Sequence, residues 1–169
     1  MRFFHLQSEY YYPGELISHL YMMMGMHLLP FYQESLNQCF NGSQDYQIIA
    51  SDIILDSVEE LDPEKPFHSL AKKIIRNMYN GSYFHKAQMV GQLADTLKPD
   101  AVIQFCHWGC KQSSGGSVLL KEEMQKKGIP MLILDGDGID KRSSHDGQIK
   151  TRLEAFLEML DTEKEEETL

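Results

Sequence analysis

Short apolar runs alternate along this chain with stretches in which apolar residues recur at helical spacing. Each run contains residues that favour extended backbone, and most of the runs are bounded by Gly or Pro, so they predict buried strands. The stretches between the runs follow the 3.6-residue period of a helix with one apolar face. The predicted strands lie at residues 20–28, at 46–55, between Pro99 and Gly109, and at 131–134.

The helical stretches predict five helices, two of which begin at a serine that can cap them. Ser82 precedes the third helix and Ser144 the last, and a serine hydroxyl at this position accepts a hydrogen bond from a free helix amide. In the fourth helix we expect Val118, Leu119 and Met124 to face a sheet. The helices are predicted at 31–40, 67–78, 83–97, about 115–127 and from 144 onward.

Each predicted helix has one apolar face. Such a face is normally buried against a sheet or another helix, because burial removes it from water. The second helix carries its face on Phe67, Leu70, Ala71, Ile74 and Ile75, the third on Ala87, Val90, Ala94 and Leu97, and the last on Ile149, Leu153, Phe156, Leu157 and Leu160.

The alternation of strands and helices predicts the fold class. Right-handed crossovers between successive strands lead to a parallel sheet with helices on both faces. We therefore expect an α/β fold with a four-stranded parallel sheet, a flavodoxin-like or Rossmann-like three-layer sandwich with strand order 2-1-3-4. An irregular N-terminal segment, 1–19, would precede a single α/β domain at 20–161, and a frayed acidic tail would follow at 162–169.

Charge and cysteine content narrow the class of protein. The chain has 169 residues and a formal net charge of -9, which argues against nucleic acid as a partner, because Lys and Arg supply affinity for phosphates. Polar residues, Gly25 and Pro30 interrupt the apolar stretch 16–32, which argues against a membrane span. Three cysteines do not form a disulfide framework, and the first residues lack the features of a signal peptide. We expect a cytoplasmic protein.

The candidate chemistry follows the third strand. Ligands of open α/β sheets bind beyond the carboxyl ends of the strands, where helix N-termini meet. Cys110 lies in this loop, and a helix N-terminus favours the thiolate that binds metals or attacks substrates, although an inert, half-buried thiol fits the pattern equally well. The same crevice would receive His107, Trp108, Gln112, Ser113 and Ser114.

The neighbours of Cys110 offer further polar groups. We consider His107 a general base or substrate hydrogen-bonding group, with a structural histidine as the alternative, and His27 is expected at another strand end. The candidate catalytic residues are His107, Gln112 and Ser113. Cys110, Ser114 and Gly115 are the candidates for cofactor binding, since hydroxyls and amides suit a phosphate, carbonyl or sulfide.

Two other groups have simpler explanations. Cys106 ends the buried strand and is expected in the core, and Cys39 lies on the apolar face of a helix. Asp135 and Asp137 follow the fourth strand with the spacing of an Asp-nucleophile phosphatase, but a Gly-rich turn with solvated carboxylates explains them better.

Several segments together resemble a known family. They are residues 59–66 (EELDPEKP), 80–81 (NG), 105–116 (FCHWGCKQSSGG), 132–137 (LILDGD) and 147–158 (GQIKTRLEAFLE). They look like the C-terminal domain of the 2-hydroxyacyl-CoA dehydratase family, which also includes benzoyl-CoA reductase subunits. The resemblance covers roughly residues 20–161.

This resemblance implies radical chemistry on an acyl-CoA. An ATP-dependent activator protein would deliver one electron to a [4Fe-4S] cluster in the dehydratase, and Cys110 would be the metal ligand from this domain. Family subunits hold the other cluster cysteines in an upstream domain, whose positions Cys39 and Cys106 do not match. Gly138 stands where the family often has Cys. We therefore expect a component that is incomplete without an upstream domain or a second dehydratase subunit, with a noncatalytic assembly module as the alternative.

Overall fold

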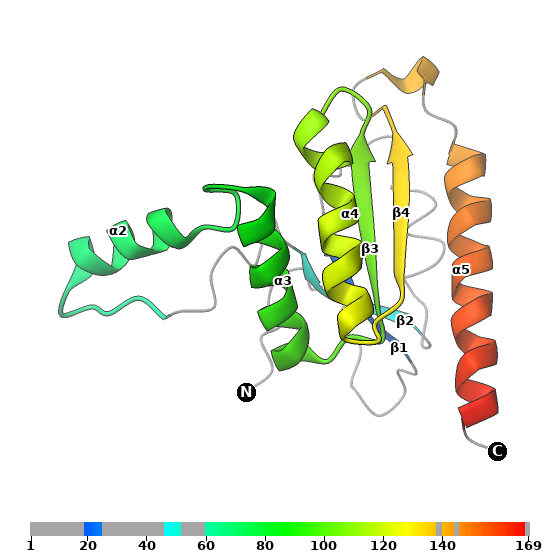
Figure 1. The fold of residues 1–169 in the computed structure, drawn as a ribbon, viewed down its shortest axis with the longest axis horizontal. Helices are drawn as coiled ribbons and strands as arrows, with labels where there is room; N and C mark the ends of the chain where they lie inside the picture. Colours follow the sequence, from blue (N-terminus) through cyan, green and yellow to red (C-terminus); the bar gives the residue numbers. More distant parts are fainter. Residues whose placement is uncertain (1–18, 25–45, 52–59, 138–139, 144–145, 168–169) are drawn as a thin grey trace.

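A parallel sheet lies at the centre of the structure. The computed structural model describes residues 19–24, 46–51, 60–137, 140–143 and 146–167 (Figure 1). Its strands pair in parallel in the order β2-β1-β3-β4, so the expected mixed α/β fold with a parallel sheet is confirmed. The elements are β1 (His19–Met24), β2 (Tyr46–Ser51), α2 (Pro66–Arg76), α3 (Tyr83–Leu97), β3 (Ala101–His107), α4 (Lys111–Lys126), β4 (Met131–Gly136), the 3₁₀ turn η2 (Lys141–Ser143) and α5 (Asp146–Glu167).

Helices cover both faces of this sheet. Successive residues of a strand point to opposite faces, so Ile103 and Phe105 of β3 pack with α5, whereas Val102 packs with α3 and α4. The α5 positions expected from the sequence are all buried, which confirms that face. The core on the α5 side also contains Ala101, Leu134, Ile149, Leu153, Phe156, Leu157 and Leu160.

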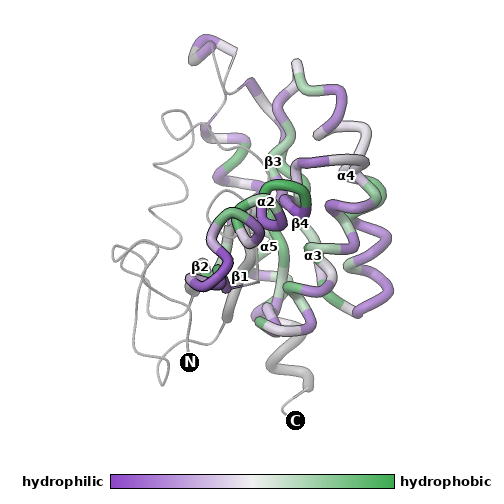
Figure 2. The backbone as a smooth tube through the Cα atoms, turned by 90° about the vertical axis from the view of Figure 1, so that its left-hand side faces the viewer, coloured by the Kyte–Doolittle hydropathy of each residue, from purple (hydrophilic) through white to green (hydrophobic). Residues whose placement is uncertain are grey.

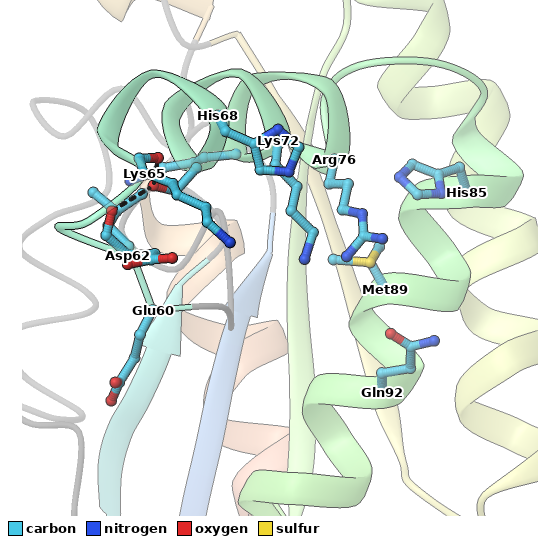
Figure 3. Close-up of a pocket in the computed structure, with 12 residues that line it drawn as sticks. Glu60, Asp62, Lys65, His68, Lys72, Arg76, His85, Met89 and Gln92 are labelled. Carbon is cyan, nitrogen blue, oxygen red and sulfur yellow. Dashed lines mark hydrogen bonds between the residues drawn. The ribbon is translucent and has the colours of Figure 1, made fainter.

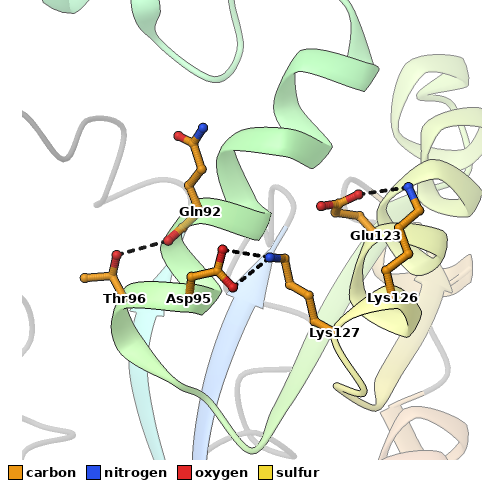
Figure 4. Close-up of polar contacts among 6 residues, drawn as sticks. All are labelled: Gln92, Asp95, Thr96, Glu123, Lys126 and Lys127. Atoms are coloured by element: carbon orange, nitrogen blue, oxygen red, sulfur yellow. Dashed lines mark hydrogen bonds and ion pairs between the residues drawn. The ribbon is translucent and has the colours of Figure 1, made fainter.

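Helices α3 and α4 pack closely along their length. Ser82 caps α3 as predicted, because its side chain accepts a hydrogen bond from the His85 amide. Near the start of α4, a Cβ on Gly116 would lie 2.1 Å from Cγ of Tyr83, so only glycine permits this approach. Near the end of α4, Lys127 forms an ion pair with Asp95 of α3 at 2.7 Å (Figure 4).

The start of α4 corrects one prediction. The helix begins at Lys111, four residues earlier than expected, because Cys110 caps it and the Gly-Gly pair does not interrupt it. Val118 and Leu119 are 57% and 37% exposed, so the expectation that they face the sheet is wrong, while Met124 is buried as expected. The close contact at Gly116 sets the rotation of the helix, and the inward positions are Gly116, Ser117, Leu120 and Met124.

Helix α2 projects from the body of the domain with its apolar side in solvent (Figure 1). Phe67 is 85% exposed and Ile74 and Ile75 are each 68% exposed. The sequence therefore predicts the helix but not the exposure of its apolar face to solvent. The polar side is turned inward instead, where the hydroxyl of Ser69 donates to the backbone carbonyls of Asp62 and Lys65. Figure 2 shows both apolar and hydrophilic colours along this helix.

Several predicted boundaries differ from the structure. β4 continues through Asp135 to Gly136, and α5 continues to Glu167, so residues expected to fray are helical. Within the described ranges, no helix has the length and apolarity needed to cross a membrane. The predictions for His27, Cys39, Ser144, the helix at 31–40 and the ends of the first two strands lie outside the described residues.

Candidate functional site

Cys110 lies where β3 passes into α4. Its amide donates to the carbonyl of His107 at 2.9 Å, which closes a tight turn, and its Sγ accepts a hydrogen bond from the amide of Ser113 at 3.4 Å. The residue is half-buried and therefore lies outside the hydrophobic core. Its Sγ is therefore accessible from outside the core, at the position that caps α4.

Cys106 has a different environment. It is 3% exposed, and burial raises the pKa of its thiol, so it stays protonated. Nε2 of Gln104 donates to its Sγ at 3.5 Å and to the hydroxyl of Tyr83 at 2.6 Å. Oε1 of Gln104 has no hydrogen-bond partner within the described part of the chain. The expectation that Cys106 is a core residue is confirmed.

His107 ends β3 beside the end of β4. Its Nδ1 lies 3.3 Å from the carbonyl oxygen of Gly136 and 3.8 Å from Oδ1 of Asp137. A carbonyl oxygen only accepts hydrogen bonds, so we assign the proton to Nδ1 and leave Nε2 able to accept one. A Cβ on Gly109 would lie 3.2 Å from Nε2, so glycine keeps this nitrogen uncrowded.

The serines of the predicted loop belong to the first turn of α4. The hydroxyl of Ser113 donates to the Phe105 carbonyl at 3.5 Å, and that of Ser114 donates to the Cys110 carbonyl at 2.9 Å. The expectation of a loop here is therefore wrong: these residues lie in α4, and both hydroxyls donate to backbone carbonyls, one of β3 and one of the helix cap. Gln112 and Gly115 are exposed on the same turn.

Asp135 connects this site to α5, a contact that the sequence reasoning missed. Its Oδ1 accepts from Arg152 at 2.7 Å and its Oδ2 from the indole of Trp108 at 3.3 Å. Arg152 also donates to the carbonyl of Ile133. With both carboxylate oxygens bonded, Asp135 is poorly placed as a phosphatase nucleophile. Arg152 lies in segment 147–158, one of the segments that resemble the family. That resemblance was the sequence signal that could have singled out this residue.

The ion pair of Asp135 predicts a small acid-dependent loss of stability. Hydrogen bonding to the Arg152 guanidinium holds the pKa of Asp135 below its usual range, and Trp108 adds to this while burial acts against it. A lowered folded-state pKa stabilises the protein above the unfolded pKa, about 3.9, and this contribution is lost as pH falls through the folded pKa.

We therefore expect Asp135→Asn to destabilise the protein slightly at pH 7 and by less at pH 3, where most of this carboxylate is protonated in the unfolded state. The loss at pH 7 stays below about 1 kcal/mol because both side chains are partly exposed, at 46% and 56%. Urea unfolding at the two pH values measures it. An equal difference between variant and wild type at both would show that the carboxylate charge contributes nothing.

The described residues offer one accessible thiol and no complete ligand set for an iron–sulfur cluster. A [4Fe-4S] cluster is held by four thiolates, and the two described cysteines are Cys106, which is sealed in the core, and Cys110. No group of three or more His, Cys, Asp or Glu side chains able to hold a metal occurs among the residues that the structure describes. Cys110, with its amide hydrogen bond and partial exposure, suits a single cluster ligand.

The fold and the site define a class: a parallel α/β domain that presents a cysteine and a histidine where β3 meets α4. The profile of the family described as "2-hydroxyglutaryl-CoA dehydratase, D-component" matches residues 19–160, and the chain belongs to that family.

Two characterised relatives are similar to part of the chain. One subunit of the benzoyl-CoA reductase of Thauera aromatica is 23% identical over 104 residues, which is 61% of this chain and 24% of the relative. The alpha subunit of the lactoyl-CoA dehydratase of Anaerotignum propionicum is 26% identical over 99 residues, 58% of this chain and 24% of the relative. The matched region thus spans about a quarter of the length of either relative.

Proposed function

We propose that this chain is a component of a 2-hydroxyacyl-CoA dehydratase or a related acyl-CoA reductase, in which Cys110 binds one iron of a [4Fe-4S] cluster. The observation that carries the proposal is the position of Cys110, half-buried at the cap of α4, in a chain of the dehydratase family. The order β2-β1-β3-β4, with helices on both faces, supports our inference of a flavodoxin-like three-layer sandwich.

The reaction would remove the hydroxyl of a 2-hydroxyacyl-CoA thioester. When bound, the cluster supplies single electrons for the thioester carbonyl, which makes the neighbouring hydroxyl a better leaving group. Nε2 of His107, with its ring held through Nδ1 by the Gly136 carbonyl, would accept the substrate proton. The exposed amide side chain of Gln112 would donate to the thioester, while Ser113 holds Cys110 through its backbone amide and Ser114 with Gly115 forms the adjoining helix turn.

The activity would need further cluster ligands from outside the matched domain. A cysteine-bearing upstream domain or second dehydratase subunit would supply the other cluster thiolates, and an ATP-dependent activator would supply electrons. Both relatives are named as subunits, and the match spans 24% of each, which supports a larger assembly. The exposed apolar side of α2 also supports it, because four large apolar side chains in water, Phe67, Leu70, Ile74 and Ile75, suit contact with another polypeptide.

Anaerobic reconstitution tests the assignment of Cys110. We expect the chain, incubated with ferrous iron, sulfide and a small thiol that occupies the open cluster positions, to give a reducible cluster detectable by electron paramagnetic resonance. Cys110→Ala should abolish the signal, because it removes the accessible described thiolate. The control Cys106→Ala removes a thiol sealed in the core and should retain the signal. A signal absent from the wild type, or undiminished in Cys110→Ala, would favour a noncatalytic assembly module.

A further inference from the structure

The turn that presents Cys110 is held from the side of β4 and α5. It comprises residues 107–110 and is closed by the hydrogen bond from the Cys110 amide to the His107 carbonyl. Every residue lining the cavity of about 500 Å³ between α2 and α3 belongs to the range 60–92, so that cavity does not extend to the turn (Figure 3). The contacts that fix the tip of the turn lie instead at the carboxyl ends of β3 and β4.

Trp108 occupies the tip of this turn and is held at two points. Its amide donates to the carbonyl of Gly136 at 3.0 Å, and the same carbonyl oxygen lies 3.3 Å from Nδ1 of His107. Its indole Nε1 donates to Oδ2 of Asp135 at 3.3 Å. The ring is the one tryptophan of the chain and is 56% exposed, so hydrogen bonds rather than burial set its orientation.

Arg152 of α5 holds the acceptor of that indole in place. One guanidinium nitrogen, Nη1, donates to Oδ1 of Asp135 at 2.7 Å, and the other, Nη2, donates to the carbonyl of Ile133. Because Arg presents its donors in a rigid planar fork, the two bonds fix the direction of the carboxylate as well as its distance. Leu153 on α5 and Leu134 on β4 are fully buried, so both ends of this link extend from backbone anchored in the core.

These contacts contribute little to the stability of the fold. The side chains of Asp135 and Arg152 are about half exposed, and water screens an ion pair in such a position. Breaking the link leaves the core intact and releases only the tip of the turn. A side chain that binds or reacts has to be held to within about 0.5 Å, which rigid elements and hydrogen bonds from neighbouring residues provide.

The geometry points to Arg152 as a positioning residue for the turn that presents Cys110. It acts through Asp135 and Trp108, and it joins α5 to the carboxyl end of β3. This inference rests on the proposed function, because a fixed turn has a chemical purpose only if Cys110 binds or reacts.

Amide hydrogen exchange, measured by nuclear magnetic resonance, tests the positioning role in the chain without metal. The amides of Cys110 and Ser113 report on the turn, because the first closes it and the second donates to the Cys110 sulfur. We expect Arg152→Met to speed exchange at both amides roughly threefold to tenfold, which corresponds to the loss of one hydrogen bond. The amide of the buried Leu120 in α4 should keep its exchange rate. Arg152→Lys, which keeps a positive charge beside Asp135, should restore part of the protection.

The rate at which iodoacetamide alkylates Cys110, read by mass analysis of its peptide, tests the position of the sulfur itself. Arg152→Met removes a positive charge and Asp135→Ala a negative one, so electrostatic effects on the thiol would change the rate in opposite directions. Loss of positioning acts in the same direction in both, because the half-buried sulfur becomes accessible more often, and we expect alkylation roughly threefold to tenfold faster in each. Trp108→Phe removes only the N–H donor and should have the same effect, and the double variant Trp108→Phe with Arg152→Met should match Trp108→Phe alone.

An ion pair elsewhere in the domain provides the matched control. Asp95→Asn breaks the 2.7 Å pair with Lys127 between α3 and α4, and it should leave exchange and alkylation at Cys110 unchanged (Figure 4). Unchanged exchange in Arg152→Met, an equal loss of protection at Leu120, or opposite changes of the alkylation rate in the two charge variants would each overturn the positioning role. Because neither measurement needs iron, a failed cluster reconstitution would overturn the cluster assignment alone.

Discussion

Gly116→Ala is expected to destabilise the domain by about 3 kcal/mol, although the same change stabilises most helices. The new Cβ would meet the root of the Tyr83 ring at 2.1 Å, where rotation of the side chain gives no relief, so α3 and α4 must separate. Displacing Tyr83 also removes its 2.6 Å hydrogen bond to the buried Gln104, which adds about 1–3 kcal/mol. Thermal unfolding should show a melting temperature about 6–12 °C lower.

Gly115 provides a matched control on the same helix. A Cβ there meets nothing within 4 Å, so Gly115→Ala should stabilise the protein by up to about 1 kcal/mol through helix propensity alone. The opposite signs of two adjacent, identical substitutions would establish the contact between α3 and α4. Stabilisation by both changes would mean that the helices do not approach as closely as the structure has them.

The pattern of apolar residues predicted the elements whose boundaries depend on local chemistry. Ser82 sets the start of α3 because a serine hydroxyl caps a helix in any context, and the apolar face of α5 follows directly from its spacing. Cys106 was predicted in the core because it ends an apolar strand. Each of these features depends on residues close together in sequence.

The errors concern residues whose position depends on distant parts of the chain. The fourth helix was predicted to begin at about residue 115, four residues late, and its rotation was wrong, because Gly116 must face the ring of Tyr83, more than thirty residues away. The pairing of Arg152 with Asp135 joins α5 to β4 and has no local signal. The exposure of the apolar side of α2 was not predicted, because it is contrary to the ordinary behaviour of an amphipathic helix.

Phe105→Ala is expected to cost about 3–5 kcal/mol, whereas Phe67→Ala should change stability by no more than about 0.5 kcal/mol. Phe105 of β3 is 1% exposed and packs against α5, so truncation leaves a cavity that the sheet cannot close. Phe67 is 85% exposed on α2, and its removal takes little apolar surface out of a packed environment. Urea unfolding of the two variants, compared with wild type, measures both free energies.

The same pair of variants bears on the proposed assembly. If the apolar side of α2 contacts another polypeptide, Phe67→Ala should be silent in the isolated chain, since the packing that it removes forms only in the complex. A loss at Phe67 as large as that at Phe105 would mean that the chain itself covers this side of α2. The exposed apolar side chains would then give no support to a partner polypeptide, and the proposal of one would rest on Cys110, the accessible thiol among the described residues.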